Sequence, residues 1–314
     1  MSTEQCMRLI LGPQSPAHNI DAAMMAAGLP EGTFATITAG WQEAENDIDT
    51  LREIVGRPLV DLRLYARADD VFRTDEALAA AHRERQNRLK EQQRLYRLRL
   101  KQLAVAARHT LRADGDAAMV AAEKRHAIAQ LRALDRHHLH RTESIGRPFG
   151  EQFNVTSSPL LARHHEEIRE VINGCSVVLI SGGNVAVLLN RLRLFGVDSL
   201  LANRHVVAWS AGAMVLAERV VLFHDRSPQG RRDAEIFGTG CGLVSGHVYF
   251  PDASHRLQER DRSRIELLCR RFAPDTCVAL DNGAALEVRN SRVATAVSVR
   301  RLSRDGRIVR LRAA

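Results

Sequence analysis

The stretch HVVAWSAGAMVLAERVVLFHD, residues 205–225, decides the fold of this chain. It opens with an apolar, β-branched run that is typical of a buried strand. Ser210 follows between small residues, and only small neighbours fit beside a turn that leads so sharply from a strand into a helix. Residues 214–219 then have a helix-forming composition. Strand, serine-bearing turn and helix together predict a nucleophile elbow, with Ala208 at the position where the usual pattern has glycine.

Strand-like and helix-like segments alternate on both sides of this stretch. Such alternation is the pattern of a doubly wound sheet, because parallel strands need long crossover connections. Strands are predicted at 8–12, 34–38, 59–65, 176–181, 243–250 and at the run Val206-Val207 before the elbow, and helices at 19–27, 44–55, 160–172, 185–195 and 258–272. Short strands and turns after residue 277 predict hairpins at one edge. The predicted fold is α/β, with a doubly wound, mostly parallel sheet.

One long segment, residues 69–147, departs from this alternation. It contains charged amphipathic helices at 75–112 and 117–137, joined by a short turn, and therefore predicts an αα-hairpin inserted into the sheet domain. We expect a single domain over residues 1–314, with its core in 7–66 and 150–314. The hairpin is predicted to be a projecting arm, a lid or a dimerisation arm. Its arginine-rich face is more typical of a solvated surface than of a nucleic-acid site.

Composition narrows the class of protein. The chain has 314 residues, 45% of them hydrophobic, and a formal net charge of +8, which favours anionic partners. Its five cysteines are scattered without CxxC spacing, as expected of reduced thiols in a cytoplasmic protein. We find no signal peptide and no apolar run of transmembrane length. His137, His138 and His140 lack the spacing of two ligands on one helix face, so no metal site is predicted.

Each part of a serine hydrolase site has a candidate. Ser210 is the nucleophile, and His255, after a predicted strand, is the base. Asp225 is the acid that would orient the histidine. The oxyanion hole would use the N–H of Ala211 together with that of Gly183 or Asn184, in the turn after strand 176–181.

These motifs resemble the peptidase E and cyanophycinase family. The similar segments are SGGNVAVLLNRLRLFG, AWSAGAMV, HD ending at Asp225, GCGL, DASH, RSRIELL and LDNGAALEV, in the family order. The resemblance covers residues 7–66 and 155–300 and leaves out the helical insertion. It implies a serine peptidase on the class I glutamine amidotransferase-like, flavodoxin-like fold. It places the nucleophile on Ser210, the histidine on His255 and the acid on Asp225, with Asp233 and Glu235 as substitutes.

The resemblance also implies a substrate class. Family members cleave after aspartyl residues, either α-linked at a peptide N-terminus or β-linked in an Asp–Arg polymer. Arg264 best matches the family arginine that precedes Ile or Leu, Arg260 lies one turn earlier, and the loop at Trp41 is also similar. An arginine fork suits the carboxylate of such a substrate. No metal or cofactor is needed, and the expected partner is a small acidic or aspartyl peptide.

Two other functions compete with this hypothesis. A glutaminase-type amidotransferase is disfavoured, because those enzymes carry cysteine at the elbow and this chain carries Ser210. The other is a weak or inactive relative that binds protein or nucleic acid through its basic helical hairpin, which is also a candidate surface for a homodimer. Loss of activity on changing Ser210 favours the peptidase, whereas salt-dependent binding without such a loss favours the scaffold.

Overall fold

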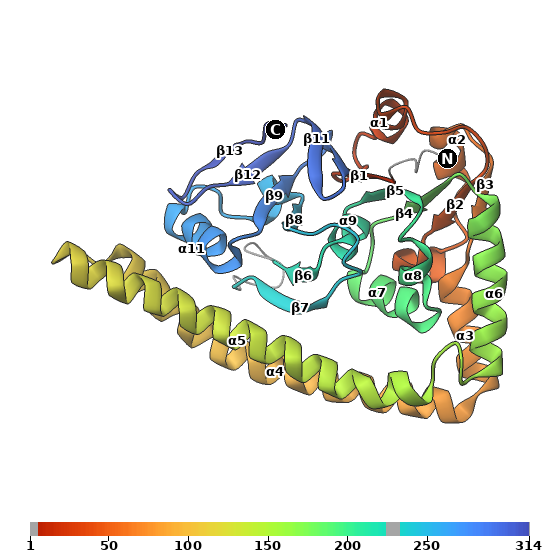
Figure 1. Cartoon of the computed structure of the whole chain (residues 1–314), viewed down its shortest axis with the longest axis horizontal. Helices are drawn as coiled ribbons and strands as arrows, with labels where there is room; N and C mark the ends of the chain where they lie inside the picture. Colours follow the sequence, from red (N-terminus) through yellow and green to blue (C-terminus); the bar gives the residue numbers. More distant parts are fainter. Residues whose placement is uncertain (1–5, 224–232, 314) are drawn as a thin grey trace.

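A computed structural model describes residues 6–223 and 233–313. Its centre is a seven-stranded sheet in the order β11-β10-β1-β5-β4-β2-β3 (Figure 1). The strands are β1 (Met7–Leu11), β2 (Phe34–Ile37), β3 (Leu59–Asp61), β4 (Val177–Ile180), β5 (His205–Trp209), β10 (Ala285–Arg289) and β11 (Arg292–Val297). The first five are parallel, and β10 and β11 form an antiparallel edge. The predicted α/β sheet is confirmed.

Helices cover both faces of this sheet. Leu9, Leu11 and Val207 pack on one face with α1 and α2, and the alternate residues of the same strands pack on the other with α6, α7 and α9. The helices are α1 (Ile20–Ala27), α2 (Asp49–Val55), α6 (Pro159–Gly174), α7 (Val185–Leu194), the short α8 (Val197–Leu200) and α9 (Ala211–Leu216). Burial on both faces explains why the strands read as continuous apolar runs.

The strand predicted at 59–65 is shorter in the structure. It ends at Asp61, because Arg63 adopts a left-handed conformation with φ of 51° and begins helix α3 (Leu64–Thr74). Leu64, Ala68 and Val71 are the buried residues of α3, a helical spacing that alternation at the sequence level obscures. A 3-10 helix, η1 (Ala39–Ala44), replaces the loop expected after β2.

The insertion forms a long antiparallel hairpin of α4 (Glu76–Arg112) and α5 (Ala117–Gln152). Asp75 and Asp116 cap the two helices by accepting hydrogen bonds from the N–H groups of Leu78 and Met119. The prediction of helix 117–137 was too short. In Figure 1 the hairpin runs along the flank of the molecule beside β7 and α11, and only its tip extends past α11.

The C-terminal half adds a second sheet in the order β13-β12-β9-β8, and a separate β6–β7 hairpin. The elements are β6 (Arg219–Leu222), β7 (Glu235–Thr239), β8 (His247–Pro251), α10 (Ala253–Arg256), α11 (Arg262–Phe272), β9 (Thr276–Leu280), β12 (Arg300–Leu302) and β13 (Ile308–Arg310). The predicted helix at 214–219 ends at Leu216, and the one at 258–272 begins at Arg262. None of the helices within the described residues combines the length and apolarity that crossing a membrane requires.

Candidate active site

Ser210 lies at the sharp turn between β5 and α9. Its φ of 52° and ψ of −118° are unfavourable for a residue with a side chain, as expected at a nucleophile elbow. A Cβ on Gly212 would lie 2.2 Å from the carbonyl oxygen of Ile180, so the turn requires this small neighbour. Ala211 is the first residue of α9, and its N–H therefore has no acceptor inside the helix.

The turn after β4 lies directly against Ser210. A Cβ on Gly182 would be 2.8 Å from the Cβ of Ser210, and one on Gly183 would be 2.3 Å from the carbonyl oxygen of Gly40. The N–H of Asn184 donates to that same Gly40 oxygen (2.7 Å), and its side chain caps α7, as the sequence predicts. The N–H of Gly183 has no acceptor among the described residues. This geometry favours Gly183 over Asn184 as the second oxyanion donor.

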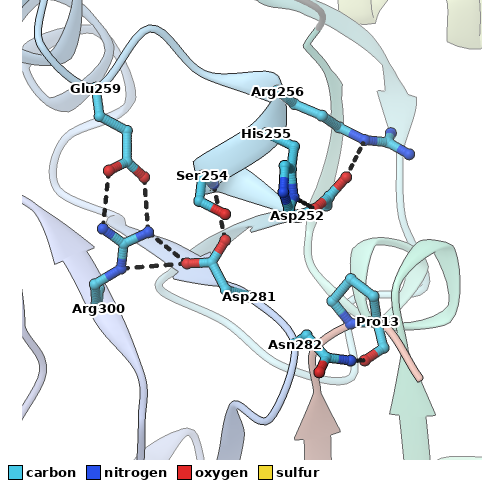
Figure 2. A network of polar contacts seen from close by, with 9 residues as sticks. All are labelled: Pro13, Asp252, Ser254, His255, Arg256, Glu259, Asp281, Asn282 and Arg300. Atoms are coloured by element: carbon cyan, nitrogen blue, oxygen red, sulfur yellow. Dashed lines mark hydrogen bonds and ion pairs between the residues drawn. The ribbon is translucent and has the colours of Figure 1, made fainter. Parts of the chain in front are cut away.

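His255 is placed by the turn that follows β8. Its side chain is 80% exposed, and its Nδ1 lies 2.6 Å from Oδ1 of Asp252, which is three residues earlier (Figure 2). Asp252 has a left-handed backbone with φ of 60°, a conformation that aspartate accepts more readily than most residues. Its other carboxylate oxygen receives the Nε–H of Arg256 at 3.3 Å.

A chain of contacts links Ser210 to residues 252–256, the segment that carries His255 and is called the histidine loop below. The N–H of Ser210 donates to the carbonyl of Leu11 (3.4 Å), at the end of β1. The next residue, Gly12, packs so closely that a Cβ there would lie 1.9 Å from the carbonyl oxygen of Asp281. The Asp281 carboxylate in turn accepts the N–H of Ser254 at 2.8 Å, one residue before the histidine. The ends of β1, β5 and β8 therefore meet at one edge. Within the described residues no hydrogen bond joins Ser210 to His255 directly.

An ion-pair network anchors the same loop from the other side. Arg300, in β12, donates to both carboxylate oxygens of Glu259 at 2.9 and 2.7 Å and also pairs with Asp281 (Figure 2). Burial alone would raise the pKa of Asp281, but the N–H of Ser254 and the guanidinium of Arg300 outweigh burial and lower this pKa. Asp281 is therefore held as a carboxylate that fixes the start of α10.

Comparison with known proteins identifies the family of this chain. Residues 137–296, half of the chain, match the model of peptidase family S51. The chain belongs to peptidase family S51. No curated protein sequence matches it. Among solved structures, a peptidase from an acI-B1 actinobacterium is 13% identical, with a TM-score of 0.48, over 99% of this chain and 95% of that one. A peptidase E protein described as putative, from Listeria monocytogenes, is 18% identical, with a TM-score of 0.30, over 44% of this chain and 65% of that one.

Membership of family S51 makes this chain a hydrolase, a serine peptidase of the peptidase E type. Both structures are too distant to add an argument about its substrate. The matched residues include the GGN turn, the elbow and the histidine loop but leave out α4. The family assignment therefore rests on the segments that build the site.

The three carboxylates predicted as candidates for the triad acid differ in their surroundings. Asp225 lies outside the described residues. Asp233 forms an ion pair with Arg108 of α4, and Glu235 receives both Nε–H and Nη2–H of Arg97. Both substitutes are therefore bound to the helical insertion, and neither contacts His255. These ion pairs do not favour either residue as the triad acid.

The three residues predicted to bind substrate lie in different parts of the structure. The Arg264 side chain is 4% exposed, and its Nη1 lies 3.7 Å from Oδ1 of Asp233, on the side of α11 that faces the insertion. Arg260 is exposed, before α11. Trp41 is partly buried against the core of α1 and α2. Asp252, which contacts His255, was not among the site residues predicted from the sequence. Its signal was its place three residues before His255, in the DASH motif already used to find the histidine.

Proposed function

We propose that this S51 peptidase hydrolyses aspartyl or isoaspartyl peptide bonds in small peptides, with Ser210 as nucleophile and His255 as base. The observation that carries this proposal is the backbone of Ser210. It has the strained turn of a nucleophile elbow at the N-terminus of α9, and the Gly182-Gly183 turn lies against it. Strain of this kind costs about 1–3 kcal/mol and persists where the surrounding structure enforces it.

The geometry supports an acyl-enzyme mechanism. The hydroxyl of Ser210 attacks the carbonyl carbon as Nε2 of His255 takes its proton, and the negative oxygen forms between the N–H groups of Ala211 and Gly183. His255 then returns the proton to the leaving amine, and a water molecule hydrolyses the ester in the reverse sequence of proton transfers. Because Nδ1 of His255 is occupied by Asp252, Nε2 is the nitrogen that serves the serine.

An exposed cation near the histidine loop, Arg260, would bind the aspartyl carboxylate of the substrate. Arg260 follows that loop, is exposed, and has no carboxylate partner in the described part of the chain. Arg264 is buried with Asp233 and is less available for this role. We therefore infer that Arg260 binds the substrate carboxylate, because an arginine can donate two parallel hydrogen bonds to a carboxylate.

The direct test uses α-Asp-X dipeptides and β-Asp-Arg side by side, with product release followed by mass spectrometry. We expect wild type to release aspartate or a short aspartyl product and Ser210→Ala to release none. Ser199→Ala changes an exposed serine whose hydroxyl bonds to the Gly196 carbonyl, and serves as the matched control. If none of the three proteins cleaves either linkage, the alternative function, binding of a partner through the helical hairpin, would be favoured.

A further inference from the structure

We propose that Asp252 is a residue that orients His255 for catalysis. This proposal rests on the assignment of Ser210 and His255 as nucleophile and base. It makes Asp252 a positioning residue, which acts on the substrate only through the histidine. Four observations support it.

The first observation is the contact itself. Asp252 Oδ1 lies 2.6 Å from Nδ1 of His255, within the range of a strong charge-assisted hydrogen bond. An ionised carboxylate only accepts hydrogen bonds, so the shared hydrogen belongs to Nδ1. That choice of tautomer leaves the lone pair on Nε2, the form in which a histidine removes a proton from serine.

The second observation is that the carboxylate of Asp252 has little freedom to turn away. Oδ1 accepts from His255, and Oδ2 accepts from Nε of Arg256. The backbone is held as well, since the N–H of Asp252 donates to the carbonyl of Leu280 at 2.7 Å and its own carbonyl accepts from Arg256 at 3.0 Å. A carboxylate fixed at both oxygens and at its backbone maintains the ring in one orientation.

The third observation is the support behind the turn. Asp281 binds the N–H of Ser254, and Arg300 joins Asp281 to Glu259, so both ends of the short segment that carries the histidine are tied to the second sheet (Figure 2). A triad acid needs such a scaffold, because a displacement of about 1 Å costs on the order of 10²-fold in rate.

The fourth observation concerns the competing carboxylates. In residues 6–223 and 233–313, Asp252 is the only carboxylate that pairs with His255. Asp233 and Glu235 are taken by Arg108 and Arg97 of the insertion. Neither of these two carboxylates therefore competes with Asp252 for His255.

Asp252→Asn is a sharp test, because asparagine keeps the shape of the side chain and tolerates the left-handed backbone as readily as aspartate. We expect kcat on the aspartyl peptide to fall by about 10²–10⁴-fold, as expected when a histidine loses the acid that selects its tautomer. KM and the melting temperature should stay near the wild-type values, and Asp252→Glu should restore part of kcat. Asp49→Asn, which removes an exposed carboxylate paired with Arg52, is the matched control.

A second readout separates this proposal from the proposed function. The rate at which a fluorophosphonate labels Ser210 reports the activated serine whatever the natural substrate is. We expect Asp252→Asn to slow labelling by a similar factor. If wild type is labelled but cleaves no aspartyl peptide, the substrate assignment fails and the labelling rates still test Asp252. Wild-type labelling in Asp252→Asn, a loss confined to Asp225→Asn, or no labelling of wild type would each overturn the inference.

Discussion

Arg271 of α11 and Asp135 of α5 form a buried, bidentate ion pair, with both nitrogen–oxygen distances at 2.7 Å. The hydroxyl of Tyr96, from α4, donates to the same Asp135 carboxylate, and Arg271 also donates to the carbonyl of Ala234, just before β7. One charged cluster therefore joins both helices of the insertion to α11 and to the start of β7. The hairpin is a docked part of the molecule over this length.

Breaking this pair should destabilise the protein strongly. Asp135→Asn leaves the Arg271 guanidinium buried without its charge partner, and we expect a loss of about 3–5 kcal/mol in the free energy of unfolding. Glu91→Gln breaks an exposed pair with Arg94 on the same helical hairpin and should cost less than about 1 kcal/mol. Urea denaturation measures both changes. Equal effects would show that the hairpin is not held by the cluster.

The strained backbone of Ser210 predicts a substitution that stabilises the protein. Ser210→Gly relieves a φ of 52°, and we expect it to raise the free energy of unfolding by about 1 kcal/mol relative to Ser210→Ala. Both variants lack the nucleophile and should be inactive. The measurement is a pair of urea melts at one pH. A glycine variant that is less stable than the alanine variant would mean that the turn stores no strain.

The Gly183 turn should not tolerate a methyl group. Gly183→Ala would place its Cβ 2.3 Å from the Gly40 carbonyl oxygen at a φ of +102°, which forces the turn away from Ser210. We expect at least a 10²-fold loss of kcat, the order seen when one oxyanion donor is lost. Gly174→Ala, at a glycine with no atom within 4 Å of the added Cβ, is the control. Steady-state kinetics of both variants decide the matter, and full activity of Gly183→Ala would exclude Gly183 as a donor.

Much of the sheet and of its site was predictable, because both follow from local patterns. The apolar strand, the small residues around Ser210 and the glycines before Asn184 each encode their own backbone geometry. A helix hidden behind a strand-like run, as at Leu64 in α3, was not predictable, since Arg63 begins it with a left-handed residue that no periodicity reveals.

The carboxylates show a second limit of sequence reasoning. Asp233 and Glu235 were reasonable acids because they follow the elbow, but their partners Arg108 and Arg97 lie more than a hundred residues earlier, in a segment without an expected role. Pairings at such a separation depend on how the insertion docks, and no local motif reports it. Asp252 was within three residues of the histidine, yet only its left-handed backbone brings its carboxylate to Nδ1 of His255.

Buried histidines predict how stability depends on pH. Burial lowers the pKa of His138 to about 4, although the nearby charge of Asp135 raises this pKa in part. The imidazole ring stacks on the ring of Tyr96, with 4.0 Å between the two ring centroids. The unfolded chain therefore takes up a proton near pH 6.5, whereas the folded chain resists until about pH 4. Stability from this group is complete above pH 6.5 and is lost as the pH falls toward 4, by up to about 1.4 kcal/mol per pH unit.

His138→Phe should remove this contribution while keeping the stacked ring, so the free energy of unfolding should fall less steeply between pH 6.5 and pH 4 than in wild type. His137→Phe changes the exposed neighbour and should keep the wild-type slope. Urea melts at half-unit pH intervals give both slopes. His82, which is half-buried and whose pKa burial also lowers to about 4, retains its own share of the slope in either variant. Parallel curves for His138→Phe and wild type would show that the buried ring is not the acid-sensitive group.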